Sequence, residues 1–104
     1  MGLFDFLGFG KKKAAIIQAL KSGAVVIDVR EPSEFERGHV EGSLNIPLGK
    51  ISSKANSISK KYSSVVTCCR SGIRSSQAAG ILKNSGVEVY NGGSWQTVRA
   101  YSEE

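Results

Sequence analysis

Histidine and cysteine are scarce in this chain, and their scarcity excludes two kinds of site. The 104 residues include one histidine and two cysteines. A structural metal centre needs three or four such ligands, so we expect no metal site. The two cysteines, Cys68 and Cys69, are sequence neighbours, and the strict geometry of a disulfide makes a bridge between them unfavourable. We therefore expect two free thiols, which suit a reducing compartment and a cytoplasmic location.

Long apolar runs and nucleotide-binding motifs are also missing. No stretch reaches the roughly 20 apolar residues of a transmembrane helix, so we expect no membrane span. The apolar segment 1–10 is followed, rather than preceded, by lysines, which is the reverse of a secretory signal. No glycine-rich phosphate or dinucleotide loop is present, and we expect no cofactor. We expect one domain over residues 1–104, with a core at about 11–101 and an apolar extension before it.

The positive charge gives a first indication of the substrate. The net charge is +5, and many of the lysines lie in two clusters, at residues 11–13 and 50–61. Such a surface is either simply solvated or attracts small anions to a site. Nucleic acid also fits the charge, but no recognition motif or interleaved aromatic pattern supports it. We therefore expect a small anionic substrate and no nucleic acid partner.

Helical and extended segments alternate along the chain. Apolar spacing predicts helices over residues 11–21, 50–61 and 75–84, a short one after Pro32 and another near Trp95. Nearly unbroken apolar runs predict buried strands at residues 24–29 and 64–68, with shorter strands near 44–46 and 87–90. This alternation predicts an α/β fold with a parallel sheet sandwiched by helices. We expect four strands, or five if the glycine-broken segment 3–9 adds one.

The segment after the strand at 64–68 carries the candidate chemistry. It reads Cys69-Arg70-Ser71-Gly72-Ile73-Arg74 and leads into a helix, with Cys69 as the first loop residue. Ligands of open parallel sheets bind at the carboxyl edge, where this loop lies. Loop amides, the helix N-terminus and both arginines all favour negative charge there. We therefore predict that the pKa of Cys69 is lowered enough to give a thiolate near neutral pH.

This loop resembles the six-residue active-site loop of the rhodanese family. Other segments resemble the remaining signatures of that family: Asp28-Val29-Arg30 with Glu34-Phe35, the residues 38–43, Asn45-Ile46-Pro47, and Asn91-Gly92-Gly93 with Trp95. Together these segments cover about residues 24–95. The resemblance implies a three-layer rhodanese-like fold and a single-domain thiosulfate sulfurtransferase.

The resemblance also implies a two-step reaction. Cys69 attacks the outer sulfur of a donor such as thiosulfate, sulfite leaves, and Cys69 holds the sulfur as a persulfide. Cyanide or a thiol acceptor, or a sulfur-accepting protein, then takes that sulfur. Arg70 and Arg74 are expected to dock the anionic oxygens of the donor. Ser71, Gly72 and Ile73 complete the substrate-binding loop.

Two alternative functions remain open at this point. One is a sulfur carrier or delivery module with little thiosulfate turnover. The other is a phosphatase-like or arsenate-reducing enzyme. Phosphatases that share the fold use a loop one residue longer, whereas here four residues separate Cys69 from Arg74. The loop length therefore favours sulfur over phosphate.

The other signature residues are expected to be structural. Asp28 and Arg30 support the loops at the end of their strand, and Arg30 is expected to pair with Glu34. His39 is expected to be a hydrogen-bonded loop residue, because a thiolate that is already charged needs no general base.

Cys68 and Trp95 each have two interpretations. Strand side chains alternate between faces, so Cys68 should point away from Cys69. It is then a small buried apolar residue, or else it relays sulfur or oxidises reversibly with Cys69. Trp95 packs on the core near the active-site edge or lines the mouth of the pocket.

Overall fold

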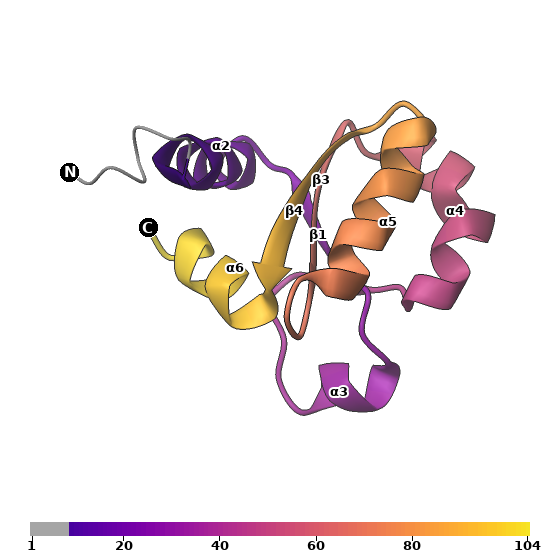
Figure 1. Ribbon diagram of the computed structural model, residues 1–104, viewed down its shortest axis with the longest axis horizontal. Helices are drawn as coiled ribbons and strands as arrows, with labels where there is room; N and C mark the ends of the chain where they lie inside the picture. The colour runs from indigo at the N-terminus through magenta and orange to yellow at the C-terminus, as the bar shows by residue number, and fades with distance from the viewer. Residues whose placement is uncertain (1–8) are drawn as a thin grey trace.

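A four-stranded parallel sheet forms the centre of the protein in the computed structural model, which describes residues 9–104 (Figure 1). The strands are β1 (Val25–Asp28), β2 (Leu44–Asn45), β3 (Ser64–Cys69) and β4 (Glu88–Ser94). Their order is β2-β1-β3-β4, and every neighbouring pair is parallel. Four strands are therefore found within the described residues. Residues 3–8 of the expected fifth strand lie outside them.

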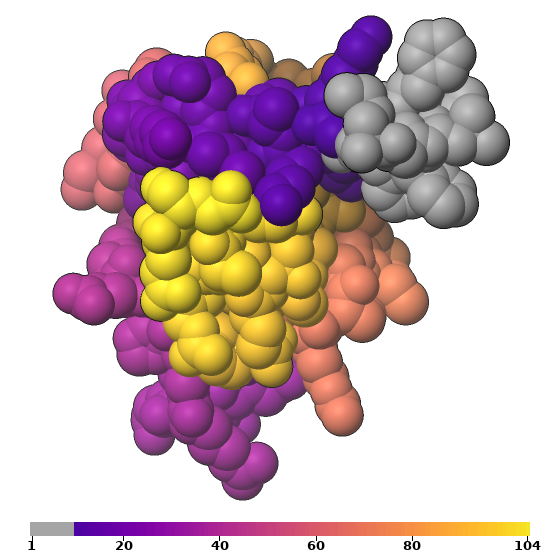
Figure 2. All heavy atoms as spheres, turned by 90° about the vertical axis from the view of Figure 1, so that its left-hand side faces the viewer, coloured from indigo at the N-terminus to yellow at the C-terminus, as the bar shows by residue number. Residues whose placement is uncertain are grey.

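Helices cover both faces of this sheet. One face carries α2 (Phe9–Lys21) and α6 (Trp95–Ser102), and the other carries α4 (Leu48–Lys61) and α5 (Ile73–Asn84) (Figure 1). Figure 2 shows α2 and α6 side by side on the surface of the first face. The short helix α3 (Pro32–Glu36) lies beyond the carboxyl ends of the strands (Figure 1). The predicted α/β sandwich is confirmed. Among the helices described, none is both long and apolar enough to pass through a membrane.

The alternation of strand side chains divides the core into two apolar clusters. Val65 of β3 belongs to the cluster that packs under α4 and α5, and Val66 belongs to the cluster under α2 and α6. Ile27 and Val26 of β1 divide in the same way. Both faces of these strands are buried, which is why the sequence shows unbroken apolar runs there.

Several element boundaries differ from the expected ones. Helix α4 begins at Leu48, directly after Pro47, and α5 begins at Ile73. Cys69 is the last residue of β3 and not the first loop residue. Strand β4 continues to Ser94 through two glycines. A Cβ at Gly92 would lie 2.8 Å from the main-chain oxygen of Thr67, so only glycine lets β4 pass this close to β3.

Candidate active site: a thiol ringed by hydrogen-bond donors

Cys69 lies at the carboxyl edge of the sheet, where β3 turns into the loop before α5. Its side chain is buried, and its Sγ accepts hydrogen bonds from the backbone amides of Gly72 at 3.0 Å and Ser75 at 3.4 Å. Gly72 has a φ of +108°, a region that residues with a Cβ rarely adopt. This turn brings the amides back toward the sulfur, so the glycine of the loop builds the ring.

The hydroxyl of Ser75 is a further partner of the thiol. Its Oγ lies 3.5 Å from Cys69 Sγ, 3.1 Å from the main-chain oxygen of Gly72 and 2.6 Å from Asn91 Oδ1. Asn91 Oδ1 also accepts from the amide of Gly93 at 3.0 Å. A hydroxyl has one proton, so Ser75 can donate to Asn91 while the sulfur is a thiol and to the sulfur when it is a thiolate.

Sequence reasoning missed the roles of Ser75 and Asn91. The sequence predicts Ser75 only as the first residue of a helix, and Asn91 only as part of a segment that resembles a signature of the family. One signal was available: Ser75 follows Arg74 directly, so it lies in the first turn of α5, where amides are free to bind an anion.

The pKa of Cys69 is lower than that of an ordinary thiol. Burial acts to raise this pKa, but hydrogen bonds from the Ser75 hydroxyl and from the amides of Ser75, Gly72 and Ser71 outweigh it. The direction agrees with the expected thiolate character. Hydrogen-bond donors close to the sulfur, and not the two arginines, are the main cause.

Arg74 and Arg30 have partners other than the expected ones. Arg74 forms a bidentate ion pair with Glu34, with N–O distances of 2.8 and 3.1 Å. The Arg74 guanidinium holds the pKa of Glu34 down to about 2. The expected pairing of Arg30 with the Glu34 carboxylate is wrong, since Arg30 pairs with Asp28 at 2.8 Å and reaches only the main-chain oxygen of Glu34. The Arg74 guanidinium therefore joins α5 to α3 through an ion pair. It is not a free positive charge beside the thiol loop.

Asp28 and Arg30 form a buried ion pair that connects the end of β1 with the segment at Gly38 and with Trp95. Both Nε and Nη2 of Arg30 donate to the Asp28 carboxylate, and Nη2 also donates to the main-chain oxygen of Gly38 at 2.6 Å. The Arg30 guanidinium lies 5.0 Å from the centre of the Trp95 ring. Breaking one partner of such a pair would leave a buried charge uncompensated. The geometry suits the expected structural role of both residues.

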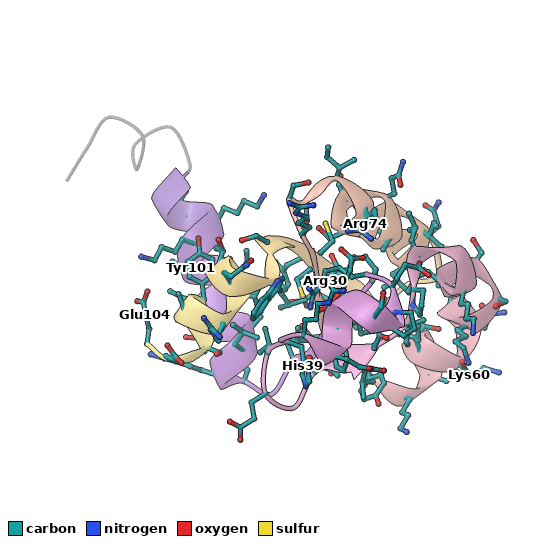
Figure 3. All side chains as sticks on the ribbon, turned by 90° about the horizontal axis from the view of Figure 1, so that it is seen from below. Arg30, His39, Lys60, Arg74, Tyr101 and Glu104 are labelled. Atoms are coloured by element: carbon teal, nitrogen blue, oxygen red, sulfur yellow. The ribbon has the colours of Figure 1, made fainter. Side chains whose placement is uncertain are left out.

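The other residues singled out from the sequence lie on the protein surface at the carboxyl edge of the sheet. Arg70 and Ser71 are exposed, and Ile73 is 71% exposed, which is unusual for a large apolar side chain. His39 lies 2.7 Å, through Nδ1, from the main-chain oxygen of Phe35 and stacks on the Phe35 ring. His39 is therefore a hydrogen-bonded loop residue. Figure 3 views this edge of the molecule, with Arg30, His39 and Arg74 labelled.

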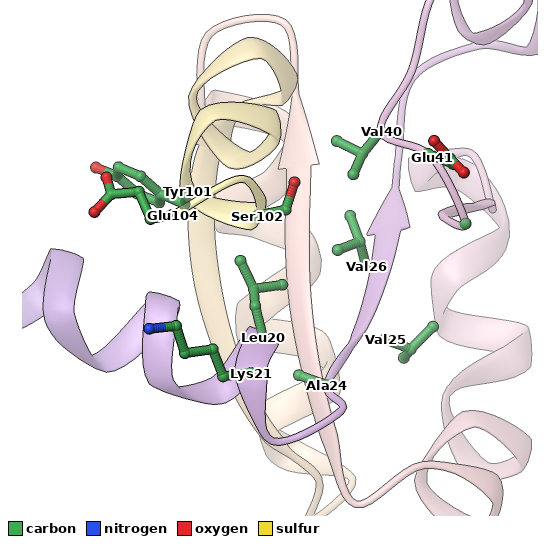
Figure 4. Close-up of a pocket in the computed structure, with 11 residues that line it drawn as sticks. Leu20, Lys21, Ala24, Val25, Val26, Val40, Glu41, Tyr101, Ser102 and Glu104 are labelled. Carbon is green, nitrogen blue, oxygen red and sulfur yellow. The ribbon is translucent and has the colours of Figure 1, made fainter.

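Two hollows help to locate the site. One, of about 340 Å³, lies at the carboxyl edge and is lined by Arg30, Glu34, Arg37, Arg70, Trp95 and Gln96. The other, of about 220 Å³, lies between α2, the end of α6 and the loop at 40–42 (Figure 4). The second cavity is lined by no residue from 68 to 75, whereas the first is lined by Arg70, so the first is the one that lies beside the candidate site. Across residues 9–104, no three metal-binding side chains gather into a candidate ion site.

The sheet and the ringed thiol define a class of protein: a three-layer α/β domain with a candidate nucleophilic cysteine at the carboxyl edge. The chain belongs to the rhodanese-like family, because the model of the rhodanese-like domain matches residues 13–98. It is 44% identical over 69 residues to YqhL of Bacillus subtilis, covering 65% of this chain and 54% of that protein. It is 38% identical over 69 residues to the thiosulfate sulfurtransferase PspE of Escherichia coli, covering 64% and 66%.

Solved structures agree with this assignment. A structure described as a rhodanese with anions from E. coli is 34% identical, with a TM-score of 0.64, and covers 72% of this chain and 91% of that one. The chain thus spans most of that solved rhodanese, but only about half to two thirds of the two relatives named above.

Proposed function

We propose that this chain moves a sulfane sulfur from thiosulfate, or a similar donor, to a thiophilic acceptor through a persulfide on Cys69. The observation that carries the proposal is the ring of donors around Cys69 Sγ, which lowers the pKa of this buried thiol. The similarity of the chain to PspE, a thiosulfate sulfurtransferase, supports the choice of donor. No cofactor is required, and two free thiols suit a reducing, cytoplasmic setting.

The first half-reaction loads the enzyme. The Cys69 thiolate attacks the outer sulfur of thiosulfate, a new S–S bond forms, and the bond to the sulfonate sulfur breaks. Sulfite leaves with the electron pair of that bond. The persulfide that remains carries negative charge on its outer sulfur, which the amides of the loop stabilise.

The surrounding residues position the donor and the loop. Arg70 is exposed beside Cys69 and is the docking group for the anionic donor, while Ser71, Gly72 and Ile73 form the wall of the loop. The role of Arg74 is proposed to be mainly positioning, because its guanidinium is paired with Glu34. Asp28 and Arg30 are proposed to stabilise the loops at the carboxyl edge of the sheet through their buried ion pair.

Intact mass spectrometry after exposure to thiosulfate tests this proposal. We expect the protein to gain the mass of one sulfur atom and to lose it again on reduction. Cys69→Ser should gain none, and Cys68→Ser serves as the matched control that still gains it. Absence of a sulfur adduct on the wild-type protein would overturn the proposal.

A sulfur carrier is the second candidate function. The observation that favours it is the similarity of the chain, 38% identity over 61 residues, to the putative sulfur carrier protein YrkF of Bacillus subtilis. Steady-state turnover of thiosulfate and cyanide separates the two. A carrier would load with sulfur but release it slowly to cyanide, whereas an enzyme would turn over.

A further inference from the structure

The pocket at the carboxyl edge borders the thiol loop without including the thiol. Arg70 follows Cys69 directly, and Trp95 follows Ser94, the residue aligned with Cys69 in the pairing of β3 with β4. Cys69 and residues 71–75 are not among the residues that line it. A ligand held in this pocket therefore lies beside the reacting sulfur and not on it.

Two positive charges in the pocket are uncompensated. Arg30 is paired with Asp28, and the carboxylate of Glu34 is paired with Arg74. Arg37, directly after α3, and Arg70 are both exposed, and neither has an acidic partner within the described part of the chain. The pocket therefore presents two unpaired guanidinium groups to an anion.

At Arg37, the geometry favours a carboxylate over the oxygens of thiosulfate. Guanidinium groups bind carboxylates through two parallel hydrogen bonds. In thiosulfate, the charged oxygens are on the atom bonded to the transferred sulfur, so thiosulfate that Arg70 docks beside Cys69 is too short to occupy Arg37 as well while it reacts. A longer ligand, with its charge several bonds from its sulfur, can occupy both places.

We propose that the pocket formed by Arg37 and Arg70 binds the carboxylate of the sulfur acceptor, an aliphatic thiol whose carboxylate lies several bonds from its sulfur. This inference rests on the proposed function and names the acceptor class for the same site. The acceptor thiolate attacks the outer sulfur of the Cys69 persulfide, and the bond from that sulfur to Cys69 Sγ breaks. Sγ keeps the electron pair as a thiolate, and the acceptor leaves as a persulfide, so no oxidant or reductant is needed.

The kinetic test starts from protein already loaded with sulfur. We compare the discharge rates for 3-mercaptopropionate and for its neutral counterpart 3-mercapto-1-propanol. Arg37→Gln should lower the preference for the carboxylate thiol by about three- to tenfold, as expected for losing an exposed charge-assisted hydrogen bond. Arg37→Lys, which keeps the charge, should recover part of that preference.

Lys60→Gln is the matched control for loss of charge. Lys60 is exposed in the last turn of α4, and Figure 3 shows it well separated from Arg30 and Arg74. Its replacement should leave the preference unchanged. An equal effect of Lys60→Gln and Arg37→Gln would show a general field and overturn the pocket assignment. An equal loss in loading from thiosulfate would assign the pocket to the donor and also overturn it.

A binding experiment separates failure of this inference from failure of the proposed function. Trp95 lines the pocket and is the only tryptophan of the chain, so its fluorescence reports occupancy. Titration with 3-(methylthio)propionate, which has no thiol, should give a saturable change that Arg37→Gln weakens about three- to tenfold. This readout does not depend on Cys69 chemistry. No saturable change, or the same midpoint in both proteins, would overturn the inference even if sulfur transfer is confirmed.

Discussion

Cys68 and Cys69 are identical neighbours that the fold places in opposite environments. Both lie in β3, and neither is more than 1% exposed. Cys68 packs in the apolar cluster under α2 and α6, where burial and then the Asp28 carboxylate raise its pKa. Cys69 turns to the other face, where hydrogen bonds lower its pKa although burial acts to raise it. The number and direction of polar partners, and not depth, therefore distinguish the two thiols.

The same comparison explains why the loop follows Cys69 rather than Cys68. Only the side chain on the α5 face can meet the first turn of that helix, which supplies the amide and hydroxyl of Ser75. On the opposite face, Cys68 has apolar neighbours, with no comparable set of donors among the described residues. A shift of the β3 register by one residue would move each cysteine side chain to the opposite face of the sheet, so the two thiols would exchange environments.

The largest contrast is expected in alkylation. At pH 7, iodoacetamide should modify Cys69 at least about 100-fold faster than Cys68, because only the thiolate reacts and only Cys69 has the partners to form it. Peptide mass mapping measures both rates in one sample. Since the pKa of Cys69 is lowered, its rate should reach a plateau below the usual thiol pKa of about 8.5. Equal rates, or a midpoint above that value, would contradict the comparison.

A smaller effect is expected from the hydroxyl of Ser75. Ser75→Ala removes the strongest of the interactions that lower the pKa of Cys69, so this pKa should rise toward its ordinary value. Alkylation and sulfur loading at pH 7 should both slow by about three- to tenfold, the effect of one modest hydrogen bond. Ser76→Ala, at the exposed next position of α5, is the control. A Ser75→Ala profile that matches the wild type would assign the lowered pKa to the amides alone.

The layered fold could be predicted from the sequence because it depends on local patterns. Unbroken apolar runs predicted the strands at 24–29 and 64–68, and spacing of apolar residues predicted the helices that cover them. The alternation of side chains along β3 placed Cys68 and Cys69 on opposite faces, and the structure confirms this. These inferences use the period of a single element, which the sequence shows directly.

The partners of the side chains in the site could not be predicted in the same way. Glu34 and Arg74 are 40 positions apart, and Ser75 and Asn91 are 16 apart, so only the packing of separate elements brings them together. The expected pairing of Arg30 with Glu34 came from the family resemblance. It does not form, because Arg30 precedes α3 and its guanidinium pairs with Asp28 of its own strand.

The smallest effect on chemistry is expected from Cys68→Ala, which tests the other side of the comparison. Loss of the sulfur leaves a small void in the apolar cluster, so the free energy of unfolding should fall by about 1 kcal/mol, measured by thermal or urea denaturation. The alkylation rate of Cys69 and its pH midpoint should stay within error, because the raised pKa keeps Cys68 neutral and its side chain faces away. If Cys68 instead oxidises reversibly with Cys69, peroxide-treated wild-type protein would lose two hydrogens by mass. If Cys68 relays sulfur, Cys68→Ala would load sulfur more slowly. Either result would mean that the two thiols act as one site.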